Sequence, residues 1–119
     1  MGKAGMKDAF SIRELEKISG GQNEVLSRLL ELFQKQLEKQ TSDIKGYMEA
    51  KNWGLLKQEA HKIKSLFRML EMQAAGKIAE QLELEAGIHL QTKEWVQHIE
   101  TMQAECGREI ERILSELGI

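Results

Sequence analysis

An apolar stripe with the spacing of an α-helix runs through the middle of this 119-residue chain. Its members recur every three or four residues, which places them along one side of a helix. Asn52, just before the stripe, has a short side chain that can accept a hydrogen bond from an amide of the first turn. The sequence therefore predicts a helix from Asn52 to Met72 that packs through one side. The members of the stripe are Trp53, Leu56, Ala60, Ile63, Phe67 and Leu70.

The rest of the chain also favours helix, because it contains no proline and only two valines but many Leu, Glu, Lys and Gln residues. A capping box of Ser11 and Glu14 is expected to open a short first helix, in which Ile12, Leu15 and Ile18 face inward. Thr92 is expected to cap the last helix. Short links between long helices favour antiparallel neighbours. The predicted fold is all-α, an antiparallel up-down-up-down four-helix bundle with a short additional N-terminal helix. The other long helices are expected over residues 22–51, 73–86 and from 92 onward.

The chain length fits a single domain with one core. Residues 1–9 lack helical periodicity and contain two glycines, so they are expected to form a flexible N-terminal tail before a bundle domain of residues 10–119. Val25 and Leu32 lie off the apolar seam of their helix. We expect the short first helix to cover them, and the alternative is an apolar contact surface for a partner.

Several classes of protein are disfavoured by composition. A formal net charge of −2 argues against a general affinity for nucleic acid or for an acidic membrane surface. One cysteine, Cys106, cannot form an internal disulfide, and its place on an apolar seam suggests packing in a reducing compartment. No apolar run approaches the ~20 residues of a membrane span. We therefore expect a cytoplasmic protein. Neither a metal motif nor a glycine-rich phosphate loop is found.

One histidine of the central helix stands apart from its apolar stripe. His61 lies roughly 140° from the stripe's centre, and its neighbours on the same side are Lys57, Lys64, Ser65 and Arg68. A neutral imidazole is a nucleophile, and each ammonium–phosphate pair at ~5 Å is worth about 3 kcal/mol at an effective dielectric of 20, before desolvation. The sector is expected to hold no carboxylate and no general base for water. Such a site could accept a phosphoryl group and pass it on.

These residues resemble the histidine phosphotransfer (HPt) domain family, and the likeness covers about residues 10–117. Its most specific part is the run Ala60-His61-Lys62-Ile63-Lys64. The remaining matching positions are Ile18-Ser19-Gly20-Gly21, Leu29-Leu30-Glu31-Leu32-Phe33, Asn52-Trp53, Leu56, Leu70, Ala75 and Leu82-Glu83.

The resemblance implies a phosphorelay intermediate of a two-component system, and not an enzyme with a small-molecule substrate. His61 would carry the phosphoryl group on Nε2, Lys64 would balance its charge, and Lys57, Ser65 and Arg68 would contribute to binding. The implied partners are response-regulator receiver domains or a hybrid histidine kinase. The receiver would supply Mg²⁺, so no cofactor is expected in this chain, which would be a monomer. The alternative is a helical adaptor that binds a receiver or kinase domain without carrying phosphate.

Three positions depart from the family's usual pattern. The family usually has glycine where this chain has Ser65 and Glu71, and a small residue at Phe67. Small residues of the following helix are expected to match the extra volume of Phe67. Glu71 is expected to resist a left-handed backbone, so the turn around it should differ in geometry. Two further histidines lack a basic setting, and we expect His89 in a loop and His98 on a solvent-facing side of its helix.

Overall fold

The computed structural model describes residues 8–118, which form five helices and no strand. Residues 1–7 of the predicted N-terminal tail lie outside the described residues. The all-α fold is therefore confirmed for the described part of the chain. The helices are α1 (Arg13–Ser19), α2 (Asn23–Glu49), α3 (Trp53–Met69), α4 (Gln73–Glu85) and α5 (Thr92–Leu117).

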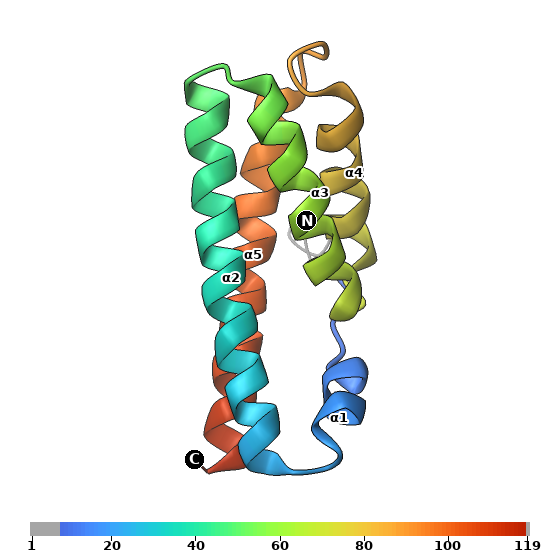
Figure 1. Cartoon of the computed structure of the whole chain (residues 1–119), viewed down its shortest axis with the longest axis vertical. Helices are drawn as coiled ribbons and strands as arrows, with labels where there is room; N and C mark the ends of the chain where they lie inside the picture. The colour runs from blue at the N-terminus through green and yellow to red at the C-terminus, as the bar shows by residue number, and fades with distance from the viewer. Residues whose placement is uncertain (1–7, 119) are drawn as a thin grey trace, which may run out of the picture.

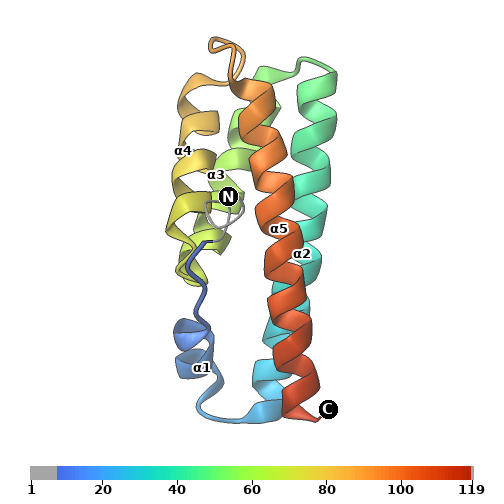
Figure 2. The ribbon, with the colours of Figure 1, turned by 180° about the vertical axis from the view of Figure 1, so that it is seen from behind.

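Four of these helices pack around a common core in the ring order α2, α3, α4, α5. The colour gradient in Figure 1 shows that successive helices run in opposite directions, and Figure 2 shows α5 lying along α2 on the other side of the bundle. α2 has 27 residues and α3 has 17, so α2 is longer by about 15 Å. The short α1 lies beyond the end of α3 and packs on α2 (Figure 1).

The predicted stripe of α3 forms part of the core. All of its members except the half-buried Trp53 have no exposed surface. Burial of each of its larger side chains stabilises the fold by about 1.5–3 kcal/mol. The side chain of Asn52 accepts a hydrogen bond from the amide of Leu55 at 3.3 Å, which confirms it as the N-cap. Burial of the stripe thus fixes the rotation of α3 about its own axis, and this rotation fixes the side on which His61 lies.

Two predictions about α1 are wrong. Val25 and Leu32 are 38% and 57% exposed, so α1 does not cover them. α1 has only seven residues, and its buried Leu15 joins the core cluster that contains Leu26 and Leu30 on a different side of α2. Ile18, which was expected to face inward, is 58% exposed. An exposed apolar surface therefore remains on α1 and the first half of α2.

The capping predictions at Ser11 and Thr92 are also wrong. The hydroxyl of Ser11 accepts from the amide of Arg13 at 3.2 Å and not from that of Glu14, because α1 begins only at Arg13. α5 begins at Thr92 itself, so the Thr92 hydroxyl lies within the first turn. It accepts from the amide of Gly87 at 3.3 Å and donates to the carbonyl of His89 at 2.8 Å. Thr92 therefore closes the α4–α5 loop.

Glu71 adopts the left-handed backbone that it was expected to resist, with φ of 58°. For a residue other than glycine this conformation costs about 1–3 kcal/mol unless its surroundings hold it. Arg13 donates two hydrogen bonds to the Glu71 carboxylate, at 3.0 and 2.7 Å. These contacts hold the side chain of Glu71 against the first residue of α1. The α3–α4 turn is therefore left-handed at Glu71 despite the missing glycine.

None of the helices described for residues 8–118 is long and apolar enough to cross a membrane.

Candidate functional site

His61 lies on the outer side of α3, and 62% of its side chain is exposed. The neighbouring residues of the helix, Ala60 and Ile63, are fully buried, so the ring cannot turn into the core without displacing them. This placement follows from the helical phase of the apolar stripe. The structure thus confirms an outward-facing imidazole that a second protein can reach.

A carboxylate from α4 contacts this ring. Nδ1 of His61 lies 2.7 Å from Oε2 of Glu83, although 22 positions separate the two residues in the chain. The prediction of a sector without a carboxylate is therefore wrong, because it considered only residues of the same helix. An ionised carboxylate can only accept a hydrogen bond, so Nδ1 carries the proton and donates it. Nε2 then keeps its lone pair, which makes it the nucleophilic atom of the neutral ring.

Glu83 also binds the predicted lysine of the site. Nζ of Lys64 donates to Oε1 of Glu83 at 2.7 Å, and the Lys64 side chain is only 13% exposed. The hydrogen bond from Lys64, followed by that from His61, lowers the pKa of Glu83 below its ordinary value of 4.5 although partial burial opposes this shift. Glu83 is therefore ionised at neutral pH, and it holds the imidazole and the ammonium group side by side.

The other predicted binding residues are divided between two places. Lys57 lines the same open depression as His61 and Glu83. Arg68 lies 3.6 Å from Glu80 of α4, measured from Nη2 to Oε1. Ser65 is exposed and lines a separate depression, with Arg68 as one of its other lining residues. The structure thus brings His61 and Lys64 to one carboxylate, with Lys57 in the same depression as His61, and places Ser65 and Arg68 at a second depression.

The sequence contained a signal for Glu83. His61 and Lys64 lie three residues apart on α3, while Glu80 and Glu83 lie three residues apart on α4. Residues with this spacing share one side of a helix. Two antiparallel helices with complementary charges at equal spacing are expected to face each other through those charges. That comparison between helices indicates that the two sets of charges meet, but not that Glu83 contacts both His61 and Lys64 while Glu80 contacts Arg68.

The remaining histidines and the cysteine do not form a second site. His89 lies in the predicted loop, where its Nδ1 accepts from the amide of Gln91 at 3.2 Å and its ring lies 5.2 Å from that of Trp95. His98 is exposed on α5, as predicted. Within residues 8–118, no group of three His, Cys, Asp or Glu side chains could hold a metal ion. Burial raises the pKa of the Cys106 thiol to about 12, which keeps it protonated at neutral pH in the folded chain.

Comparison with models of protein families gives a match over most of the chain. A family model described as "Hpt domain" matches residues 28–117. The matched region includes α3, α4, α5 and most of α2, and therefore contains both His61 and Glu83, whereas α1 lies outside it. No curated protein and no solved structure gives a significant match to the chain.

Proposed function

Because this chain belongs to the Hpt domain family, which serves histidine phosphotransfer in two-component phosphorelays, we propose that His61 is its phosphoryl-accepting residue. In this proposal His61 receives the group from an aspartate of one receiver domain and passes it to another receiver. The observation that carries the proposal is the hydrogen bond between Nδ1 of His61 and Glu83 on a side chain that is 62% exposed, because this contact makes Nε2 the nitrogen with the lone pair in the neutral ring. The protein is then a carrier of phosphate, with a transient phosphohistidine.

The transfer step follows from this geometry. The lone pair of Nε2 attacks the phosphorus of the aspartyl phosphate, so an N–P bond forms. The P–O bond to the aspartate breaks, and its electron pair leaves with the aspartate carboxylate. The phosphorylated ring becomes cationic while Nδ1 keeps its proton, and the ionised Glu83 stabilises that charge at 2.7 Å. The Mg²⁺ that phosphoryl transfer uses would belong to the receiver.

Lys64 has a different role in this scheme. Its ammonium group is held by Glu83 next to the ring, where it can balance the negative charge of the incoming phosphoryl group. Lys57, in the same depression, adds to the positive charge. Arg68 is paired with Glu80 and can reach the phosphoryl group only by leaving that contact. We therefore assign the main electrostatic role to Lys64.

Phosphoryl uptake by single variants tests the assignment. His61→Gln should abolish acid-labile, base-stable labelling from a phosphorylated receiver while helix content by circular dichroism stays unchanged. His98→Gln, which alters an exposed histidine of α5, is the matched control and should label like the parent. Labelling that persists in His61→Gln would overturn the proposal. Lys64→Ala should slow transfer without preventing it, and an unaltered rate would remove the role of Lys64.

A second candidate function is favoured by the exposed apolar residues of α1 and α2. Ile18, Val25 and Leu32 remain 58%, 38% and 57% exposed, which suits a contact surface for a partner protein. A helical adaptor would use such a surface to bind a receiver or kinase domain without carrying phosphate. Receiver binding by a chain that never becomes labelled would favour the adaptor. We expect the chain to act as a cytoplasmic monomer in either case.

A further inference from the structure

The segment before α1 attaches to the start of α4. One carboxylate oxygen of Asp8 accepts a hydrogen bond from the amide of Ala74 at 3.0 Å, and the other accepts from the amide of Ala75 at 2.9 Å. α4 starts after Met72, whose side chain makes no capping hydrogen bond. Amides of the first turn need an acceptor, and a negative charge there also complements the helix dipole. Asp8 therefore caps α4 from a distant part of the sequence.

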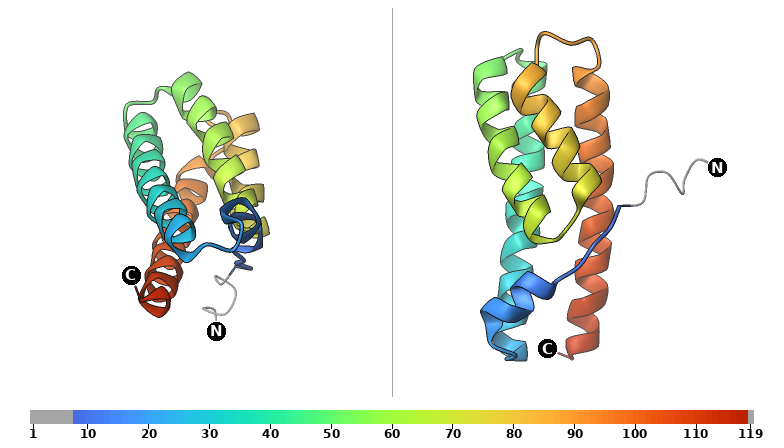
Figure 3. Two further views of the ribbon diagram at one scale, coloured as in Figure 1. Left: turned by 60° about the horizontal axis from the view of Figure 1, so that its bottom comes forward. Right: turned by 90° about the vertical axis from the view of Figure 1, so that its right-hand side faces the viewer.

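Two further attachments to the same turn come from this segment and from the first residue of α1. The amide of Ser11 donates to the carbonyl of Leu70, at the end of α3, at 2.8 Å. Arg13 donates its two hydrogen bonds to Glu71, the residue with the left-handed backbone. Asp8, Ser11 and Arg13 are thus all hydrogen-bonded to residues at or next to the α3–α4 turn. The right-hand view of Figure 3 shows the segment passing this turn on its way to α1.

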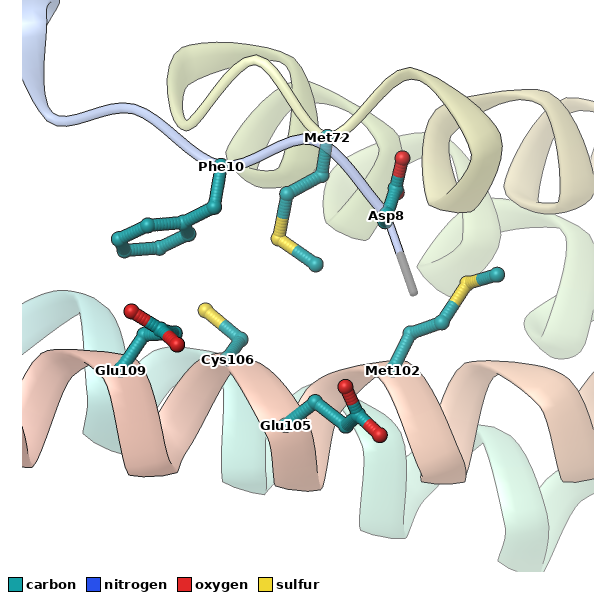
Figure 4. A pocket seen from close by; sticks show the side chains of 7 residues that line it. All are labelled: Asp8, Phe10, Met72, Met102, Glu105, Cys106 and Glu109. Carbon is teal, nitrogen blue, oxygen red and sulfur yellow. The ribbon is translucent and has the colours of Figure 1, made fainter. Parts of the chain in front are cut away.

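The segment also covers a small cavity between the α3–α4 turn and α5. Figure 4 shows Asp8 and Phe10 on one side of this cavity and residues of α5 on the other. Cys106, one of the α5 residues, faces the cavity and is only 1% exposed. The Cys106 thiol and the segment therefore lie at the same cavity.

This segment is less buried than the core. None of residues 8–14 is fully buried, whereas Leu15 of α1 has no exposed surface. Opening the segment as far as Arg13 therefore breaks its polar attachments and uncovers the half-buried Phe10 and Ile12, but leaves the Leu15 anchor in place. Regions with few buried apolar contacts open at a lower free energy than the whole fold.

We propose that residues 8–13, which we call the strap, form a conformational device that opens and closes over the α3–α4 turn while the bundle stays folded. The closed strap caps α4, holds Glu71 and shields Cys106. The open strap leaves the first turn of α4 uncapped and exposes the thiol. Since the turn connects the helix of His61 to that of Glu83, the strap acts on the link between the two halves of the candidate site. The proposal does not depend on phosphotransfer.

Thiol labelling tests the strap directly, because Cys106 is the only cysteine of the chain. Loss of an N-cap is expected to favour opening about 5- to 30-fold. Asp8→Ala should therefore accelerate the reaction of Cys106 with a thiol reagent by that factor in buffer without denaturant. Asp43→Ala is the matched control, because Asp43 pairs with Lys39 on α2. Equal acceleration in both variants would overturn the proposal.

Dependence on urea separates strap opening from global unfolding. Opening of the strap exposes little surface, so the labelling rate of the parent should hardly change at low urea. A rate that follows the full m-value of unfolding at every urea concentration would show that no separate opening exists. Arg13→Gln provides a second variant if Asp8→Ala does not fold. It should also accelerate labelling, and an unchanged rate would overturn the part assigned to Arg13.

Discussion

Replacement of Glu83 by alanine is the sharpest test of how the site orients its histidine. The substitution removes the acceptor that keeps the proton on Nδ1 of His61. A hydrogen bond to a charged group contributes about 1.5–3 kcal/mol. His61 is 62% and Glu83 27% exposed, so solvent screening points to the lower end of that range. A loss of about 1.5 kcal/mol corresponds to a roughly tenfold slower uptake of phosphate from a receiver.

The assay combines a rate with a spectrum. Single-turnover uptake from a labelled receiver gives the rate, and the ¹⁵N shifts of the His61 ring give the tautomer. Glu83→Gln keeps an oxygen acceptor without the charge, so its rate should fall between those of the parent and Glu83→Ala. Glu80→Ala, which removes the partner of Arg68, is the control and should leave the His61 tautomer unchanged.

Loss of Glu83 also frees Lys64, which could speed transfer and mask the effect. The same substitution is therefore repeated in a Lys64→Ala background, where only the contact with His61 remains to be lost. An unchanged rate and an unchanged tautomer in that background would refute the orienting role of Glu83.

The dependence of the folding stability on pH adds a further check. Because the folded pKa of Glu83 is lowered, its contribution to stability is complete above its unfolded value of about 4.5 and is lost as the pH falls through the lower folded value.

Two further predictions concern stability and are measured by urea unfolding. Gly87→Ala should destabilise the fold by about 2–5 kcal/mol, because φ is +84° and a Cβ would lie 2.5 Å from Cγ of Trp53. Gly21→Ala, with φ of +80° and open space around its Cβ in the described structure, should cost only about 1–2 kcal/mol, and equal losses would refute the clash with Trp53. Thr41→Val should leave stability unchanged or raise it by about 1 kcal/mol, because the Thr41 hydroxyl is buried without a hydrogen-bond partner among residues 8–118. A clear loss would show that this hydroxyl has a partner.

The apolar periodicity of the individual helices, with the short links between them, was sufficient to predict the all-α fold. The periodicity of α3 was sufficient to predict the exposure of His61. The stripe from Leu56 to Leu70 fixes which side of α3 is buried, and this phase alone turns the histidine to solvent. Asn52 could be predicted as a cap because its partner amide lies three residues away. Such features depend on near neighbours in the chain, which a single sequence displays directly.

Contacts between distant segments could not be predicted in the same way. Glu83 reaches His61 only because α4 packs beside α3, and Asp8 reaches α4 across 66 positions. Glu71 was expected to avoid a left-handed backbone on its intrinsic preference, but the tertiary contact with Arg13 holds it there. Val25 and Leu32 were expected to be covered by α1, but the seven residues of α1 pack on another side of α2.

The unequal helix lengths bear on where this protein can be shortened. The family match begins at residue 28, after α1 and the first turn of α2. A fragment cut at that boundary would lack Leu15, the fully buried side chain that α1 contributes beyond the end of α3. The fragment would also lose residues 23–27 of α2, including the buried Leu26, and the surface of α2 on which α1 packs would be uncovered. The start of the family match is thus a poor choice for the first residue of an expressed fragment, and such a fragment should aggregate more readily than the full chain.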